Sequence, residues 1–144
     1  MYEDSSQLAV EVEADKGRIT QVISNLLSNA INFTKEGSIT INVLRKRRNE
    51  DGKNNSHEAV VSVEDTGIGI DSEILPRLFT KFATKSDTGG TGLGLFISKS
   101  IVEAHGGKMW AENNNRINNG QKRGATFYFS LPLMANNNNM YTNT

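Results

Sequence analysis

Apolar residues between Ile19 and Phe33 recur at intervals of three and four, the spacing of one face of an α-helix. Asp15 stands ahead of this segment as a helix N-cap, and Gly37 follows it as a stop. The pattern therefore predicts a long amphipathic helix. Its apolar members are Ile19, Val22, Ile23, Leu26, Leu27, Ala30 and Ile31.

The remaining pattern predicts a second helix, several strands and a polar tail. Leu93 to Ala104 carries another helical apolar stripe, which Gly106 and Gly107 end. A short helix is expected from Asp71 to Leu75, before Pro76. Strands are expected at Gln7 to Val12 (an edge strand), Ser38 to Leu44, Ala59 to Glu64, Lys108 to Ala111 and Thr126 to Leu131.

The order of these elements predicts the fold class. Strand, helix, two strands, a loop, helix and two strands favour an α/β fold, a two-layer sandwich with helices on one face of a mixed, mostly antiparallel sheet. With 144 residues, of which 36% are hydrophobic, the chain is long enough for one core. We expect one domain over residues 1–135 and a disordered tail over 136–144.

Composition excludes some functional classes. The 16 basic and 16 acidic residues give a formal net charge of +0, so no global field favours nucleic acid or an anionic membrane as a partner. The basic run Arg45 to Arg48 favours a solvated strand end over a binding patch. With Cys 0, disulfides and thiolate metal sites are excluded, and a reducing compartment fits. No apolar run reaches the roughly 18 residues of a membrane helix.

Four short motifs follow one another along the chain. They are NLLSNA at Asn25, DTGIGI at Asp65, LFTKF at Leu78 and GGTGLGL at Gly89. Each motif alone is a weak signal, because asparagines on helices and glycines in turns are common structural residues. The ordered set is much more specific.

Asn25 and Asn29 lie four residues apart, so both amides leave the same side of the predicted helix, and Gln21 and Asn32 extend that polar row. A solvent-facing side of an amphipathic helix is one explanation. Amides in place of Lys and Glu favour another, because amide oxygens are hard ligands suited to Mg²⁺.

Asp65 follows a β-branched strand and precedes Gly67 and Gly69. A carboxylate at a strand end can accept a hydrogen bond from an amino group, and the glycines let the backbone pass close to a planar base. A simple Asp-Thr-Gly turn is the alternative.

The glycines from Gly89 to Gly94 open the second predicted helix, where backbone N–H groups and the helix dipole suit a triphosphate. A flexible hinge is the alternative, and both can hold. The preceding stretch, Thr80 to Gly90, has few apolar anchors and is expected to form a loop that closes over the site.

These motifs resemble the catalytic, ATP-binding domain of histidine protein kinases. That domain belongs to an ATPase superfamily that includes type II topoisomerases, mismatch-repair ATPases and heat-shock chaperone ATPases. The resemblance runs from about Val10 to Pro132. It implies a Bergerat-type α/β sandwich that binds ATP and Mg²⁺ between helices and sheet.

The resemblance also implies roles for residues. Asn29 would be the Mg²⁺ ligand, Asn25 a catalytic group beside the phosphates, and Asp65 the partner of the adenine amine. Lys85 is a candidate contact for the γ-phosphate, at a place where relatives often carry a nearby arginine. The other cofactor-binding positions implied are Asn32, Gly67, Gly69, Gly90, Thr91, Gly92, Leu93, Gly94 and Thr126. At Asn32 relatives commonly carry a lysine, so this chain departs from the pattern there.

The implied function is transfer of the γ-phosphoryl group of ATP to a histidine on separate dimerisation helices, with a response regulator downstream. His57 and His105 both lack the sequence context of a phosphoacceptor. The resemblance places this domain in the cytoplasm, as a monomer without nucleic acid or membrane contact, whether or not the complete protein is anchored to a membrane.

Three alternatives stay open within the same superfamily. An ATP-hydrolysing conformational ATPase would carry a glutamate where this chain has Asn25. A serine-kinase anti-sigma factor is disfavoured by the same asparagine and by the phenylalanine motif at Leu78 to Phe82. A non-catalytic nucleotide sensor is the third.

Overall fold

The computed structural model describes residues 10–48, 56–83, 92–114, 117–118, 121–122 and 124–134. The predictions for Lys85, Gly90, Thr91 and the tail at 136–144 lie outside these residues. The elements are α1 (Lys16–Phe33), β1 (Ile39–Arg47), β2 (His57–Asp65), η2 (Leu75–Arg77), α2 (Gly94–Ala104), β3 (Met109–Asn113), β4 (Ile117–Asn118), β5 (Gln121–Lys122) and β6 (Ala125–Pro132).

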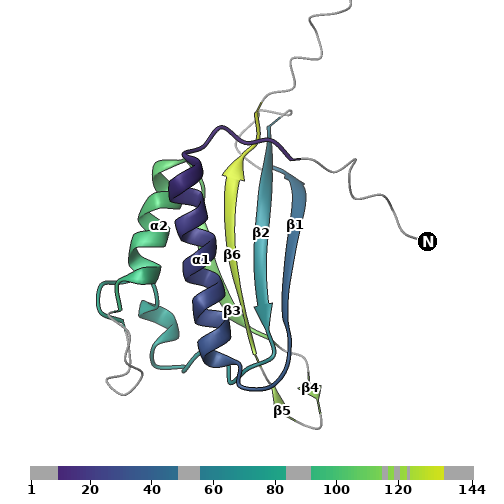
Figure 1. The fold of residues 1–144 in the computed structure, drawn as a ribbon, viewed down its shortest axis with the longest axis vertical. Coiled ribbons are helices and arrows are strands. Elements are labelled where there is room, and N and C mark those ends of the chain that lie inside the picture. Colours follow the sequence, from purple (N-terminus) through teal and green to yellow (C-terminus); the bar gives the residue numbers. More distant parts are fainter. Residues whose placement is uncertain are drawn as a thin grey trace, which may run out of the picture.

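The elements form two layers. Four strands make a sheet in the order β1-β2-β6-β3, and α1 and α2 lie together on one of its faces (Figure 1). This arrangement confirms the predicted α/β sandwich. All strand pairs in the described residues are antiparallel. The edge strand expected from Gln7 to Val12 does not appear at residues 10–12, and its other residues lie outside the described ranges.

The core lies between the helices and the two central strands, β2 and β6. Val63 is paired with Phe127 in the β2–β6 register, and Val61 with Phe129. Because side chains alternate between faces, these odd-numbered positions all point toward the helices. Phe129 is only 1% exposed. The opposite face carries a stacked cross-strand pair, Trp110 and Tyr128, with ring centroids 5.1 Å apart.

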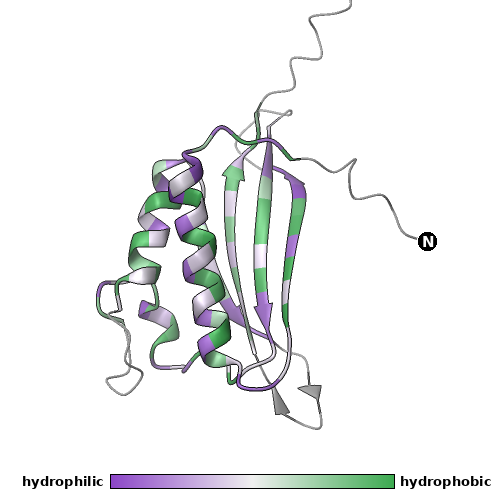
Figure 2. Ribbon diagram, viewed as in Figure 1, coloured by the Kyte–Doolittle hydropathy of each residue, from purple (hydrophilic) through white to green (hydrophobic). Residues whose placement is uncertain are grey.

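The helices take their places because each has one apolar side. Along both helices in Figure 2, hydrophobic bands alternate with polar ones. The buried residues of α1 are Val22, Leu26 and Ala30, and those of α2 include Ile101 and Val102. Asp15 caps α1, as predicted, because its Oδ1 accepts the Arg18 N–H at 3.1 Å.

The segment before Pro76 departs from the prediction. In place of a short α-helix from Asp71 to Leu75, the chain forms a turn and then the 3₁₀ helix η2, which contains Pro76. Proline lacks an N–H, and only the first turn of a helix tolerates that loss, so Pro76 lies in the first turn of η2, which begins at Leu75, instead of following a helix.

We expect Leu26→Ala in α1 to lower the free energy of unfolding by ~2–5 kcal/mol, because Leu26 is 0% exposed and its loss leaves a cavity. Ile31→Ala on the same helix is the matched control. Ile31 is 63% exposed, so its change should stay within about 0.5 kcal/mol. Urea unfolding followed by circular dichroism measures both, and equal losses would contradict this account of the core.

Candidate functional site

Two of the sequence motifs meet along α1. At the C-terminal end of the helix, Ile68 N–H donates to the Phe33 carbonyl at 3.3 Å, which attaches the turn after β2 to α1. Farther back, Asn25 Nδ2 donates to the Gly94 carbonyl at 3.3 Å and to Ser98 Oγ at 2.9 Å. Asn25 and Asn29 form a row of amide side chains on α1, called here the amide row. It therefore runs between the start of α2 and the turn that follows Asp65.

Asp65 is the buried acid of this site, at 1% exposure. Its Oδ1 accepts the Gly67 N–H at 2.9 Å and the Ala125 N–H at 3.4 Å. Burial raises the pKa of Asp65 above its ordinary value of 3.8, the two backbone hydrogen bonds lower it, and the charge of Glu64 adds a further rise. The net direction is upward, so the fold holds this carboxylate against a desolvation cost.

The turn after Asp65 requires glycine at Gly67. A Cβ on Gly67 would collide with the Phe33 carbonyl oxygen and would approach Thr34 Oγ1. The Thr34 hydroxyl oxygen is itself buried without a hydrogen-bond partner among the described residues. This end of the site, next to Gly67, therefore carries a buried polar oxygen that can accept or donate a hydrogen bond.

Two asparagines that sequence reasoning missed hold this turn in place. Asn113 Oδ1 accepts the Ile70 N–H at 2.7 Å, and its Nδ2 donates to the Ile70 carbonyl at 2.9 Å. Asn114 Nδ2 donates to the Asp65 carbonyl at 3.0 Å. Both residues open an asparagine-rich stretch. Asn113 is the last residue of β3 and Asn114 follows it, and this position at the end of a strand was the one available signal.

Thr126 is not brought to the carboxylate of Asp65. In the β2–β6 register Thr126 is the partner of Glu64, so its side chain leaves the face opposite to Asp65. Its hydroxyl donates to Asn114 Oδ1 at 2.6 Å. The residue beside the acid is Ala125, which has no hydroxyl. Thr126 supports the site through Asn114.

The three asparagines of α1 have different environments. Asn25 is half-buried and uses its Nδ2 to hold the start of α2. Asn29 is also half-buried, and in the described part of the chain its amide makes no hydrogen bond, whereas Asn32 is exposed. Asn29 therefore offers an amide oxygen on the same side of α1 as Asn25, which fits one ligand of a Mg²⁺ that keeps waters and phosphate oxygens as its other ligands.

The start of α2 is shaped by a contact with the phenylalanine motif. Gly92 adopts φ +69, and a Cβ there would lie 2.6 Å from Phe82 Cα. Phe82 N–H donates to the Gly92 carbonyl at 2.9 Å, with Phe82 at φ 61. The Phe82 side chain is 65% exposed. Leu93 and Gly94 follow at the α2 N-terminus, where no side chain caps the helix.

Among the described residues, no group of three or more His, Asp or Glu side chains gathers to hold a cation. A cation at this site would therefore depend on amide oxygens and on a ligand's own oxygens. The donor set of α1 fits Mg²⁺ bound together with a triphosphate better than a free-standing metal centre.

The chain belongs to a known family. Residues 14–135 match the model of the histidine kinase-, DNA gyrase B- and HSP90-like ATPases. Sensor protein FixL of Bradyrhizobium diazoefficiens is 41% identical over 130 residues, which cover 88% of this chain and 23% of that protein. Sensor histidine kinase WalK of Bacillus subtilis is 36% identical over 127 residues, covering 84% of this chain and 19% of that protein. The chain thus spans less than a quarter of the length of these relatives.

Solved structures agree with the sequence relatives. The catalytic domain of histidine kinase ThkA is 38% identical with a TM-score of 0.63, over 84% of this chain and 71% of that one. Full-length ShkA, solved in complex with AMPPNP, is 29% identical with a TM-score of 0.66, over 88% of this chain and 24% of that one. Together the comparisons define a histidine kinase-type, ATP-binding domain.

We expect Asp65→Asn to raise the free energy of unfolding of the ligand-free domain at about pH 7. The asparagine keeps an Oδ1 acceptor for Gly67 and Ala125 but removes the buried charge. Because the pKa of Asp65 is raised on folding, the native state takes up its proton first as pH falls, so the wild type regains stability between the folded pKa and 3.8. The advantage of the variant should therefore vanish toward about pH 3.

Chemical unfolding at a series of pH values measures this difference. Glu58→Gln is the control, because Glu58 is a half-buried carboxylate of the same strand at the end far from Asp65. It should give no gain at about pH 7. An Asp65→Asn variant that is less stable than the wild type at every pH would contradict the desolvation argument.

Proposed function

We propose that this domain binds Mg-ATP and donates the γ-phosphoryl group to a histidine on a separate pair of helices, as the catalytic part of a two-component kinase. One observation carries this proposal. The buried carboxylate of Asp65 ends β2, and the turn that follows it is attached to α1, the helix that carries the amides of Asn25 and Asn29. In this family such a site binds nucleotide.

Adenine would bind at the Asp65 end. The Gly67 and Ala125 N–H groups both donate to Oδ1 of Asp65. We assign the other carboxylate oxygen, Oδ2, to the exocyclic amine of adenine. Gly67 and Gly69 keep the backbone beside it free of side chains. The Thr34 hydroxyl, buried and unpaired in the described residues, is a further polar contact for a base or a water at this end.

The phosphates would lie toward the start of α2. N–H groups at this helix end and the helix dipole attract negative charge, and the Asn29 oxygen would hold Mg²⁺. When bound, Mg²⁺ neutralises charge on the transferring phosphoryl group. Asn25 keeps the α2 terminus against α1. The contacts assigned to Lys85, Gly90 and Thr91 stay predictions.

We assign the phosphoacceptor role to neither histidine of the chain. His57 lies in β2, a strand of the sheet, and not on a helix. His105 has both ring nitrogens in hydrogen bonds, to Ile101 and Asp15. We therefore assign the acceptor histidine to another region, with a response regulator downstream.

We also propose a cytoplasmic, monomeric domain, whether or not the complete protein is anchored to a membrane. In the described part of the chain, no helix is both long enough and apolar enough to cross a bilayer.

Radiolabelled γ-phosphate ATP tests the reaction. The domain alone should neither label itself nor hydrolyse ATP rapidly. A histidine-bearing helix pair fused ahead of Tyr2 should acquire acid-labile phosphate, because tethering raises the effective concentration to the millimolar range. The same fusion with its acceptor histidine changed to alanine is the control. Rapid hydrolysis by the domain alone would favour a conformational ATPase, acid-stable label a serine kinase, and binding without transfer a nucleotide sensor.

We expect Asn29→Ala to abolish the Mg²⁺-dependence of ADP binding. With Mg²⁺ present the affinity should fall about tenfold, equal to ~1.4 kcal/mol, because the protein ligand of the ion is gone. In EDTA the variant and wild type should bind alike. Calorimetry measures both conditions, and Asn42→Ala on exposed β1 is the matched control. A normal response of Asn29→Ala to Mg²⁺ would show that this amide only faces solvent.

A further inference from the structure

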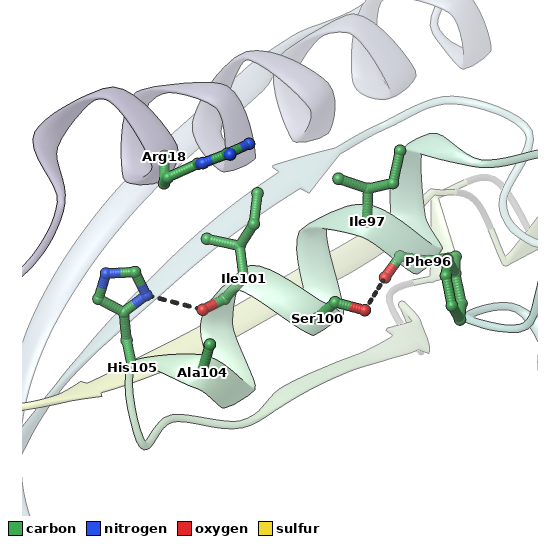
Figure 3. A pocket seen from close by; sticks show the side chains of 7 residues that line it. All are labelled: Arg18, Phe96, Ile97, Ser100, Ile101, Ala104 and His105. Atoms are coloured by element: carbon green, nitrogen blue, oxygen red, sulfur yellow. Dashed lines mark hydrogen bonds between the residues drawn. The ribbon is translucent and has the colours of Figure 1, made fainter.

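His105 forms a bridge between the two helices. It stands directly after α2, and its Nδ1 lies 2.7 Å from the Ile101 carbonyl oxygen, the contact drawn in Figure 3. Its Nε2 accepts the backbone N–H of Asp15, the N-cap of α1, at 3.1 Å. A carbonyl can only accept and an N–H can only donate, so the ring must be neutral, with its proton on Nδ1.

A second bridge joins the same helices, from the middle of α1 to the start of α2. Asn25 Nδ2 donates to Gly94 and Ser98 in the first turns of α2. Asp15 and Asn25 are ten residues apart, so the two bridges are separated by roughly 15 Å along α1. Between them lie buried apolar side chains, among them Val22 and Ile101, whose packing limits sliding of the helices. The two hydrogen-bonded bridges add directional contacts to this packing and so help to set the axial register of α1 against α2.

That register matters for the proposed nucleotide site, on which this inference rests. Asn29 is carried by α1, and the phosphate-binding N–H groups are carried by the start of α2. A shift of about 1 Å between such groups is enough to impair binding geometry. We infer that neutral His105 is a positioning residue, which holds the amide row of α1 in register with the α2 terminus and releases it when the ring is protonated.

Several charged residues belong to the elements that meet at His105. They are Asp15, Lys16 and Arg18 at the start of α1, Glu103 in α2, which is paired with Lys99 at 3.8 Å, and Arg48, whose Nη2 donates to the Gly106 carbonyl at 3.1 Å. Arg18 lines the same shallow groove as His105 (Figure 3). A proton on Nε2 turns the acceptor into a donor that faces the Asp15 N–H, and the bridge is lost.

His105→Gln separates positioning from packing. The glutamine carbonyl oxygen can take the place of Nε2 as acceptor and does not titrate. MgADP affinity is measured at about pH 8 and about pH 5.5, which bracket histidine titration. The quantity to compare is the affinity of the wild type divided by the affinity of the variant at the same pH. In this ratio, the effects of titrating the ligand and Asp65 cancel. The ratio should be near one at the higher pH and fall about three- to tenfold at the lower.

Two further variants complete the test. His105→Ala should bind more weakly than His105→Gln at both pH values by a similar factor. His57→Gln, which removes the other histidine of the chain, should keep the wild-type pH profile. A ratio that does not change with pH, or a change that follows His57, would overturn the inference.

Failure of the proposed function gives a different result. If the wild type bound no nucleotide at about pH 8, the proposed function would fail. The inference would then be decided by NMR of the free domain. The ¹⁵N shifts of His105 should report the Nδ1–H tautomer, and the Asp15 amide should lose protection from exchange as the ring titrates. A ring protonated on Nε2 at about pH 8, or an Asp15 amide insensitive to pH, would overturn it.

Discussion

The burial of one carboxylate organises this end of the molecule. Asp65 is held by N–H groups from its own turn and from the start of β6, and its carbonyl is held by Asn114. A buried charge is costly unless hydrogen bonds surround it. The close approach of β6, the glycine at Gly67 and the asparagines at the end of β3 all serve that requirement. The fold accepts this cost at the position where we propose that adenine binds.

Most of the fold could be predicted because its central elements have clear periods. The residues of α1 repeat every three to four positions, and β2 and β6 are rich in β-branched and aromatic residues. The ends of elements were less certain. Pro76 was expected to follow the end of a helix but lies in the first turn of the helical segment Leu75–Arg77, since proline is common both just after a helix and in its first turn.

Residue chemistry and spacing singled out Asn25 and Asp65 as candidate site residues, and their roles stay proposals. The sequence could not show which face of the sheet a strand residue occupies, because one step along a strand reverses it. Thr126 and Ala125 are neighbours, yet only the latter lies beside the acid. The roles of Asn113 and Asn114 could not be predicted for a different reason. In a stretch rich in asparagine, composition does not show which asparagine side chains form hydrogen bonds with the turn after Asp65.

The backbone hydrogen bond between Phe82 and Gly92 has a consequence for how the length of the chain can vary within this family. Because the Phe82 N–H is hydrogen-bonded to the Gly92 carbonyl, the two ends of the segment between these residues are held together at one point. The entropy of closing such a loop grows only with the logarithm of its length, by about 0.6 kcal/mol for each doubling. Insertions and deletions there cost little stability, so evolution can change the length of this segment while the helices and sheet around the ligand stay the same.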